Sequence, residues 1–98
     1  MEIKFTWSER KAKLNLQNHQ ISFELAQNVF FDPYAVFVED CETSSGEMRY
    51  HAIGYAKGQL LLVVIYLDLS DNDEEKIHII SARKAEAFEE TIYGNQFE

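Results

Sequence analysis

The chain has 98 residues, 46% of them hydrophobic, and nine Lys and Arg against seventeen Asp and Glu give it a formal net charge of −8. This size and composition predict one ordered domain over residues 1–98 and exclude a disordered acidic tail. The single Cys41 excludes an internal disulfide, and the longest apolar run, 60–67, is too short to cross a bilayer, so we expect a protein of the reducing cytoplasm.

The first third of the chain predicts a short strand followed by two helices. Residues 2–6 alternate polar and apolar side chains, as a strand does. Ser8 can accept a hydrogen bond as the N-cap of a helix over 9–18, and Ser22 can do the same for a second helix. Pro33 should end that second helix, because the residue before a proline disfavours the helical conformation.

In the rest of the chain the hydrophobic pattern has a period of two residues, as in β-strands. It predicts strands over 34–39, 48–56, 60–67 and 76–81, and a last helix over 83–93. The connections are expected to be a polar loop over 41–46, a tight turn at Lys57-Gly58 and an acidic loop over 70–75. The order β-α-α-β-β-β-β-α predicts an α+β fold in which an antiparallel sheet carries two N-terminal helices and one C-terminal helix.

Four residues near the start, Trp7, Lys11, Asn15 and His19, follow one another at intervals of four. In a helix this spacing places the last three on one face, which then carries a cation, an amide and an imidazole. Such a face is either solvated or assembled for a ligand. His19 is an acid–base candidate because its unperturbed pKa of about 6.5 allows proton transfer at neutral pH, although a helix-end histidine also suits the helix dipole.

Three further cations are candidates for binding an anion. Arg49 lies in the middle of a predicted strand, where its planar group either faces solvent or makes a two-point contact with a phosphate. Arg83 and Lys84 are expected at the start of the last helix, where two cations oppose the helix dipole and therefore suggest a functional role.

The sequence shows no metal-site spacing. His51 and His78 stand alone in predicted strands, and Asp71-Asn72-Asp73 lacks the glycine and the terminal bidentate glutamate of an EF-hand calcium loop. We therefore expect neither a metal ion nor another cofactor.

Several segments occur in an order and spacing that resemble one known family. They are the series Trp7, Lys11, Asn15 and His19, followed by 19–24, Val29-Phe30, Asp32-Pro33, Arg49-Tyr50 with Ile53-Gly54, and 79–85 with Glu89 and Tyr93. In these segments the chain resembles the BrnT family of bacterial toxins, the ribonuclease halves of type II toxin–antitoxin modules related to RelE. The resemblance extends from residue 7 to residue 93.

This resemblance implies a RelE-like fold and metal-independent cleavage of RNA that slows translation. It implies a cognate antitoxin, a small DNA-binding protein of BrnA type, and an oligomer formed through that antitoxin. Four side chains would carry the reaction, namely His19, Lys11, Arg49 and Arg83. Four others would contact the substrate: Trp7, Asn15, Tyr50 and Lys84.

Two other interpretations remain open at this stage. Glu86 and Glu90 stand where the family tends to carry Arg or Thr, which favours a catalytically weakened member that acts as a protein-binding partner of a DNA-binding antitoxin. The acidic composition would also suit an unrelated α+β interaction domain.

Overall fold

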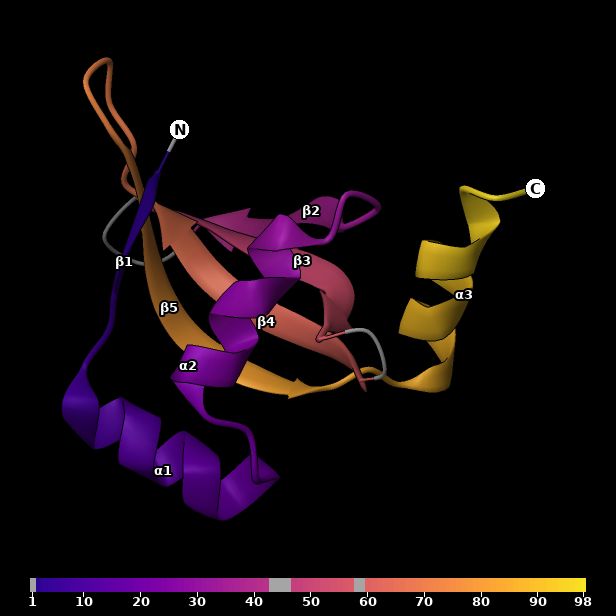
Figure 1. Cartoon of the computed structure of the whole chain (residues 1–98), viewed down its shortest axis with the longest axis horizontal. Coiled ribbons are helices and arrows are strands. Elements are labelled where there is room, and N and C mark those ends of the chain that lie inside the picture. The colour runs from indigo at the N-terminus through magenta and orange to yellow at the C-terminus, as the bar shows by residue number, and fades with distance from the viewer. Residues whose placement is uncertain (1, 43–46, 58–59) are drawn as a thin grey trace.

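The structure, a computed structural model, describes residues 2–42, 47–57 and 60–98 (Figure 1). Its elements are, in chain order, β1 (Ile3–Thr6), α1 (Glu9–His19), α2 (Phe23–Ala26), the 3₁₀ helix η1 (Gln27–Phe31), β2 (Val36–Glu42), β3 (Met48–Ala56), β4 (Leu60–Asp68), β5 (Glu75–Lys84) and α3 (Ala87–Asn95). This order confirms the predicted α+β fold. In the described ranges every helix is too short or too polar to span a bilayer.

The five strands form one sheet in the order β1-β5-β4-β3-β2. Strands β2 to β5 pair antiparallel with their neighbours in sequence, as predicted, whereas β1 joins the edge parallel to β5. The parallel pair requires a long crossover, and nearly the whole chain supplies it.

Helices α2 and η1 lie over one side of the sheet, which we call the core face, and α1 lies beside them along the edge of β5 (Figure 1). Ser8 and Ser22 cap α1 and α2 as predicted, through bonds to the backbone N–H groups of Lys11 and Leu25. The largest apolar cluster lies here, with Phe23, Val29, Ala52, Val64 and Ile79 all fully buried. Burial of this apolar surface supplies the main driving force for folding.

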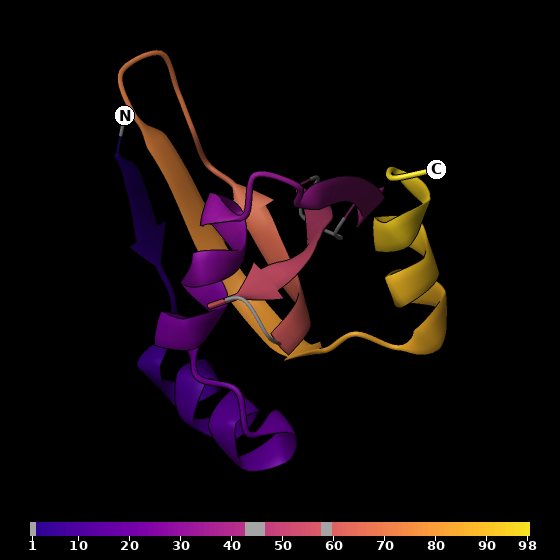
Figure 2. The ribbon, with the colours of Figure 1, turned by 45° about the vertical axis from the view of Figure 1, so that its right-hand side comes forward.

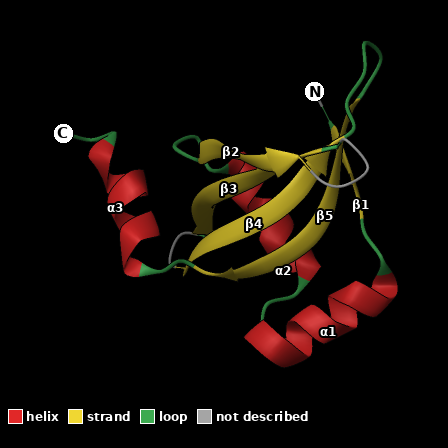
Figure 3. Cartoon of the chain, turned by 180° about the vertical axis from the view of Figure 1, so that it is seen from behind, coloured by secondary structure: helices red, strands yellow, loops and turns green. Residues whose placement is uncertain are grey.

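The opposite side, which we call the open face, is covered at one end only. There α3 packs against the sheet through a small cluster of Ile53, Val63 and Tyr93 (Figures 2 and 3). Val63 faces α3 while Val64 faces the core, so β4 is buried on both sides, as its continuous apolar run predicts. Across the ranges that the structure describes, no helix covers the rest of the open face.

One carboxylate ties α3 to η1 and β3. Asp32 Oδ2 accepts bonds from the Tyr93 hydroxyl and the Tyr55 N–H, both at 2.8 Å, and Asp32 Oδ1 accepts from the Tyr34 N–H at 2.9 Å. Burial raises the pKa of Asp32, but these three bonds outweigh it and lower the pKa overall. Gly54 permits the approach, because a Cβ there would lie 3.2 Å from Asp32 Oδ2 and 3.0 Å from Val29 Cγ1.

Two predicted boundaries are wrong. Strand β2 begins at Val36 rather than at Tyr34, because the Ala35 N–H bonds to the Asp32 carbonyl in a turn. The second helix shortens to α2 and continues as η1, a common change at a helix C-terminus. The predicted loop over 41–46 and turn at Lys57-Gly58 lie partly outside the described residues.

A third wrong boundary concerns the last helix, which was predicted from Arg83. Strand β5 instead continues to Lys84 in register with Leu62 of β4, and α3 begins at Ala87. Arg83 and Lys84 therefore end a strand, and the argument that they oppose a helix dipole does not apply. Pairing with β4 overrides the helix propensity of these residues.

The side-chain amide of Asn15 fixes α1 against β5. Beyond His78, where β1 ends, the outer edge of β5 has no neighbouring strand. Asn15 Nδ2 donates to the carbonyls of Ala82 (2.9 Å) and Ile21 (2.8 Å), and its Oδ1 accepts from the Ala82 N–H (3.1 Å). The amide therefore makes the two bonds to Ala82 that a further strand would make, within a buried setting.

We expect Asn15→Ala to destabilise the fold by about 3 kcal/mol, because buried backbone groups at Ala82 and Ile21 lose their partners. Urea denaturation of the purified protein measures this change. Asn18→Ala, at an exposed position of the same helix, is the matched control. Equal free energies of unfolding for the two variants would contradict the role given to Asn15.

Candidate functional site

The open face carries two arginines and a histidine from β3 and β5. Side chains alternate along a strand, so Arg49 and His51 share a face with Ile53, which packs against α3. Arg83 stands opposite Val63 on the same face. Strands β3 and β5 thus direct these three side chains to one side of the sheet.

The register fixes their spacing. Arg49 pairs with Leu67 of β4 and Arg83 pairs with Val63, four residues away along β4 and on its other side. The two arginine Cα atoms are therefore about 16 Å apart, taking ~3.4 Å per residue and ~4.8 Å per strand. His51 pairs with Ile65, which places its Cα about 12 Å from that of Arg83 by the same spacings.

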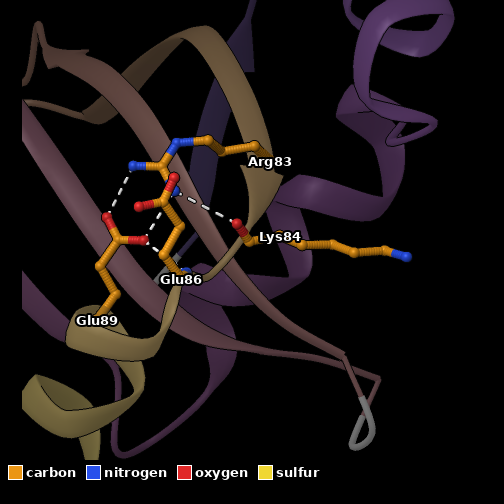
Figure 4. A network of polar contacts seen from close by, with 4 residues as sticks. All are labelled: Arg83, Lys84, Glu86 and Glu89. Carbon is orange, nitrogen blue, oxygen red and sulfur yellow. Dashed lines mark hydrogen bonds and ion pairs between the residues drawn. The ribbon is translucent and has the colours of Figure 1, made fainter.

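The best-defined contact of the site is an ion pair between Arg83 and Glu89. Nη1 and Nη2 of Arg83 each donate to one carboxylate oxygen of Glu89 at 2.7 Å, and Nη1 also donates to the Lys84 carbonyl at 3.3 Å (Figure 4). Glu89 is only 2% exposed, and its Oε1 also accepts from the Glu86 N–H at 2.9 Å in the capping box of α3.

Both charges of this pair are stabilised. The hydrogen bond from Arg83 lowers the pKa of Glu89 below its usual value, although burial acts in the other direction. His51 adds a smaller lowering effect on the pKa of Glu89, which places its ring within electrostatic reach of the pair. The bond to Glu89 raises the pKa of Arg83. Both groups are therefore ionised at neutral pH.

Of the residues spaced by four along α1, one is buried and two are exposed. Asn15 is buried, and its amide is used by the fold, as described above. Lys11 and His19 are exposed one turn before and one turn after it, the latter at the last residue of α1. Asn15 bonds to Ala82, the residue before Arg83. Lys11 and His19 are each four residues from Asn15, which is about 6 Å along the helix axis.

The two aromatic candidates lie on the core face. Trp7 packs edge-on against Phe23 with a centroid distance of 5.8 Å, and Tyr50 stacks on Tyr66 at 5.5 Å. Neither of them shares a face with Arg49, which is exposed on the open side. The structure therefore places Arg49 and Arg83 on one face of the sheet and leaves Trp7 and Tyr50 on the other side.

Lys84 is exposed and lies beside a groove. The groove measures about 700 Å³ and lies between α3 and the adjoining ends of β3 and β4, where Tyr55, Tyr93 and Phe97 line it with Lys84. Among the described residues no group of three His, Cys, Asp and Glu side chains is placed to hold a metal ion.

Sequence reasoning assigned no role to Glu89 or to His51. With a helix starting at Arg83, residues six apart point in different directions, so no pair with Glu89 would form. The pair exists because β5 ends at Lys84 and the chain turns before α3. The alternation of β3 does place His51 on the face of Arg49, a signal that the sequence contained.

Comparison with known proteins adds two findings. Residues 7–89 match the profile of a family described as the ribonuclease toxin BrnT of type II toxin–antitoxin systems. The 1.1 Å crystal structure of the Brucella abortus ribonuclease toxin BrnT matches with a TM-score of 0.62 and 23% identity, covering 87% of this chain and 99% of that one. The structural likeness shows the shared fold. No curated protein matches the chain significantly.

We expect Glu89→Gln to reduce the dependence of stability on acid pH. Because the folded pKa of Glu89 is lowered, its pair with Arg83 stabilises the protein fully above the unfolded pKa of about 4.3. That stabilisation is lost as the pH falls through the folded pKa. The free energies of unfolding of wild type and Glu89→Gln should therefore differ at pH 7 and converge towards about pH 3 in urea titrations.

Glu90→Gln is the control, since Glu90 is an exposed neighbour on the same helix. It should follow the wild-type dependence on pH. If the difference in free energy of unfolding between wild type and Glu89→Gln stays constant from pH 7 to pH 3, the ion pair contributes nothing to the loss of stability in acid.

Proposed function

The chain belongs to the BrnT family of ribonuclease toxins of type II toxin–antitoxin systems, and from this premise we propose that it cleaves RNA without a metal ion, on the open face of its sheet. The observation that carries the proposal is the placement of Arg49 and Arg83 on that same face, with Arg83 directly after Ala82, the residue that anchors α1. Cleavage there would slow translation in the cytoplasm.

The proposed reaction uses the ribose 2′-hydroxyl as nucleophile. It attacks the adjacent phosphate, the 5′-oxygen leaves, and one proton is removed while another is delivered. His19 transfers a proton in this scheme. Lys11, Arg49 and Arg83 balance the charge that accumulates on the phosphoryl oxygens. Lys84 contacts the RNA backbone beside Arg83.

The other three predicted substrate contacts are reassigned within this proposal. Trp7 and Tyr50 pack on the core face, and Asn15 holds α1 against β5. In this proposal Asn15 acts indirectly, through the position of the helix that carries Lys11 and His19, and Trp7 and Tyr50 belong to the core rather than to the RNA-binding face.

The distribution of charge supports RNA binding despite the net charge of −8. The acidic residues of 71–74 lie in the connection between β4 and β5, which projects from the side of the sheet away from α3 (Figure 1). The local sign of the surface, rather than the net charge, decides where a phosphate backbone binds.

A type II toxin has an antitoxin as partner. We further propose that this antitoxin is a DNA-binding protein of BrnA type, that a basic or amphipathic segment of it covers Arg49 and Arg83, and that the complex oligomerises through the antitoxin. Such a segment would complement the acidic body while it excludes RNA from the open face.

A second candidate function is a weakened toxin that serves mainly as an antitoxin-binding partner. The ion pair between Arg83 and Glu89 favours it, because Glu89 neutralises one of the cations proposed to hold phosphate. Incubation of antitoxin-free protein with labelled RNA in EDTA separates the two candidates.

We expect wild-type protein to cleave RNA in EDTA and to arrest growth when expressed alone. His19→Ala should reduce the cleavage rate by about 10²–10⁴-fold, the usual contribution of a proton-transfer group. Arg49→Ala should also relieve arrest, and Lys11→Ala should have a smaller effect, because it supplies charge without transferring a proton. Lys13→Ala, at an exposed position of the same helix, is the control for Lys11→Ala.

Equal cleavage by wild type and His19→Ala, at equal soluble concentrations, would remove His19 from the mechanism. An absence of cleavage by the wild type would favour the weakened toxin.

We expect association with the antitoxin to be sensitive to salt, because opposite charges steer the two proteins together. Stopped-flow association rates should fall by at least tenfold between about 0.05 M and 0.5 M NaCl. Arg49→Ala should change the dissociation rate if the antitoxin covers the open face. Association rates that do not change with salt would exclude a charge-driven encounter.

A further inference from the structure

Arg83 uses only part of its hydrogen-bonding capacity. A guanidinium group has five N–H donors in one plane. The end formed by Nη1 and Nη2 binds both oxygens of Glu89, and the second N–H of Nη1 binds the Lys84 carbonyl. This leaves the edge formed by Nε–H and the other N–H of Nη2 without a partner among the described residues.

This second edge is accessible. About a quarter of the Arg83 side chain, 26%, is exposed. Among the described residues no fully buried side-chain nitrogen or oxygen lacks a hydrogen-bond partner, which agrees with an Nε of Arg83 that contacts solvent. The Nε–H and Nη2–H pair is a fork that matches two oxygens of a phosphate group.

The position of Glu89 decides how an anion can reach Arg83. The residue is 2% exposed and its carboxylate is also held by the Glu86 N–H, so it cannot turn out to solvent without breaking the cap of α3. A phosphate that replaced Glu89 on the Nη1–Nη2 end would leave a buried carboxylate without its counter-ion, which is strongly unfavourable. An incoming phosphate is therefore expected on the free edge.

We propose that Glu89 is a positioning residue, which holds the guanidinium of Arg83 so that its Nε–H and Nη2–H edge binds one phosphate of the RNA. The inference rests on the proposed function and deepens it. Glu89 neutralises part of the charge of Arg83, which weakens its attraction for phosphate. It also fixes the Arg83 side chain, which would otherwise lose rotamer freedom on binding RNA.

Steady-state cleavage of a labelled RNA by wild type and Glu89→Gln tests the proposal. The glutamine keeps the size of the side chain but turns one acceptor into a donor that repels the guanidinium. We expect kcat to fall by about 10–100-fold, while KM stays the same or decreases because a negative charge has been removed. In an Arg83→Ala background, Glu89→Gln should cause no further loss.

Two control variants separate positioning from a loss of structure. Glu90→Gln makes the same chemical change one residue away at an exposed position and should leave kcat unchanged. Tyr93→Phe removes a different tie of α3, its bond to Asp32, without contact with Arg83. A loss in Tyr93→Phe as large as that in Glu89→Gln would assign the effect to docking of α3 and overturn the proposal. A rise in kcat/KM for Glu89→Gln would show that Glu89 competes with phosphate and would also overturn it.

A second readout does not depend on activity. The ¹H–¹⁵N signals of arginine Nε–H groups can be followed while an uncleavable 2′-O-methyl RNA is added, and the Arg83→Lys variant identifies the signal of Arg83. We expect this signal to shift in the wild type and to shift less in Glu89→Gln. A wild-type Arg83 signal that RNA leaves unchanged would contradict the proposal. A shift in a protein that cleaves no RNA would support the positioning role and reject the ribonuclease function.

Discussion

The contact between the Asn15 amide and the free edge of β5 determines how the two halves of the candidate site meet. Strand β1 satisfies the outer edge of β5 only as far as His78. At Ala82 a side chain on α1 takes over, with bonds of 2.9 and 3.1 Å to its carbonyl and N–H. These bonds set the position of α1, and therefore of Lys11 and His19, relative to the strand that carries Arg83. A polar residue that looked available for a ligand is instead the reason that the other polar residues have a fixed geometry.

The alternation of side chains along the strands separates the residues that form the core from the residues of the candidate site. One face of the sheet collects the apolar and aromatic residues that pack against α1, α2 and η1, including Tyr50. The other face carries Arg49, His51 and Arg83, and α3 covers only its end. An acidic chain can therefore present a local cationic surface, because sheet geometry sorts neighbouring residues onto opposite faces. The helix α3 contributes both to packing and to the candidate site, since Tyr93 packs against the sheet while Glu89 holds Arg83.

The elements that could be predicted from sequence are those with a strong local pattern. The apolar run of β4, the alternation of β3 and the serine caps of α1 and α2 gave correct elements and a correct fold. The end of β5 could not be predicted in the same way, because residues 82–85 have helix-compatible side chains and only pairing with β4 keeps them extended. The position of Arg83 at a strand end, and with it the pair to Glu89, depends on that pairing.

Single residues show the same limit. The four-residue spacing of Lys11, Asn15 and His19 correctly places them on one face of a helix, but spacing cannot reveal that the middle residue meets Ala82, 67 positions later in the chain. Tyr50 follows Arg49 directly and for that reason points to the opposite face. The face of Tyr50 could therefore be predicted from the alternation along β3, whereas the long-range contact of Asn15 with Ala82 is one that a single sequence does not display.

The central claim is that RNA lies across the open face, and NMR titration with an uncleavable 2′-O-methyl RNA tests it most directly. The chain offers a reporter for each face: the imidazole C–H signals of His51 on the open face, and the indole N–H of its single tryptophan, Trp7, which bonds to Glu9 and packs on the core side. The account predicts that the His51 signals shift in proportion to RNA bound while the Trp7 signal stays in place. A shift of the Trp7 signal with no change at His51 would contradict it and would move the binding site to the other side of the sheet.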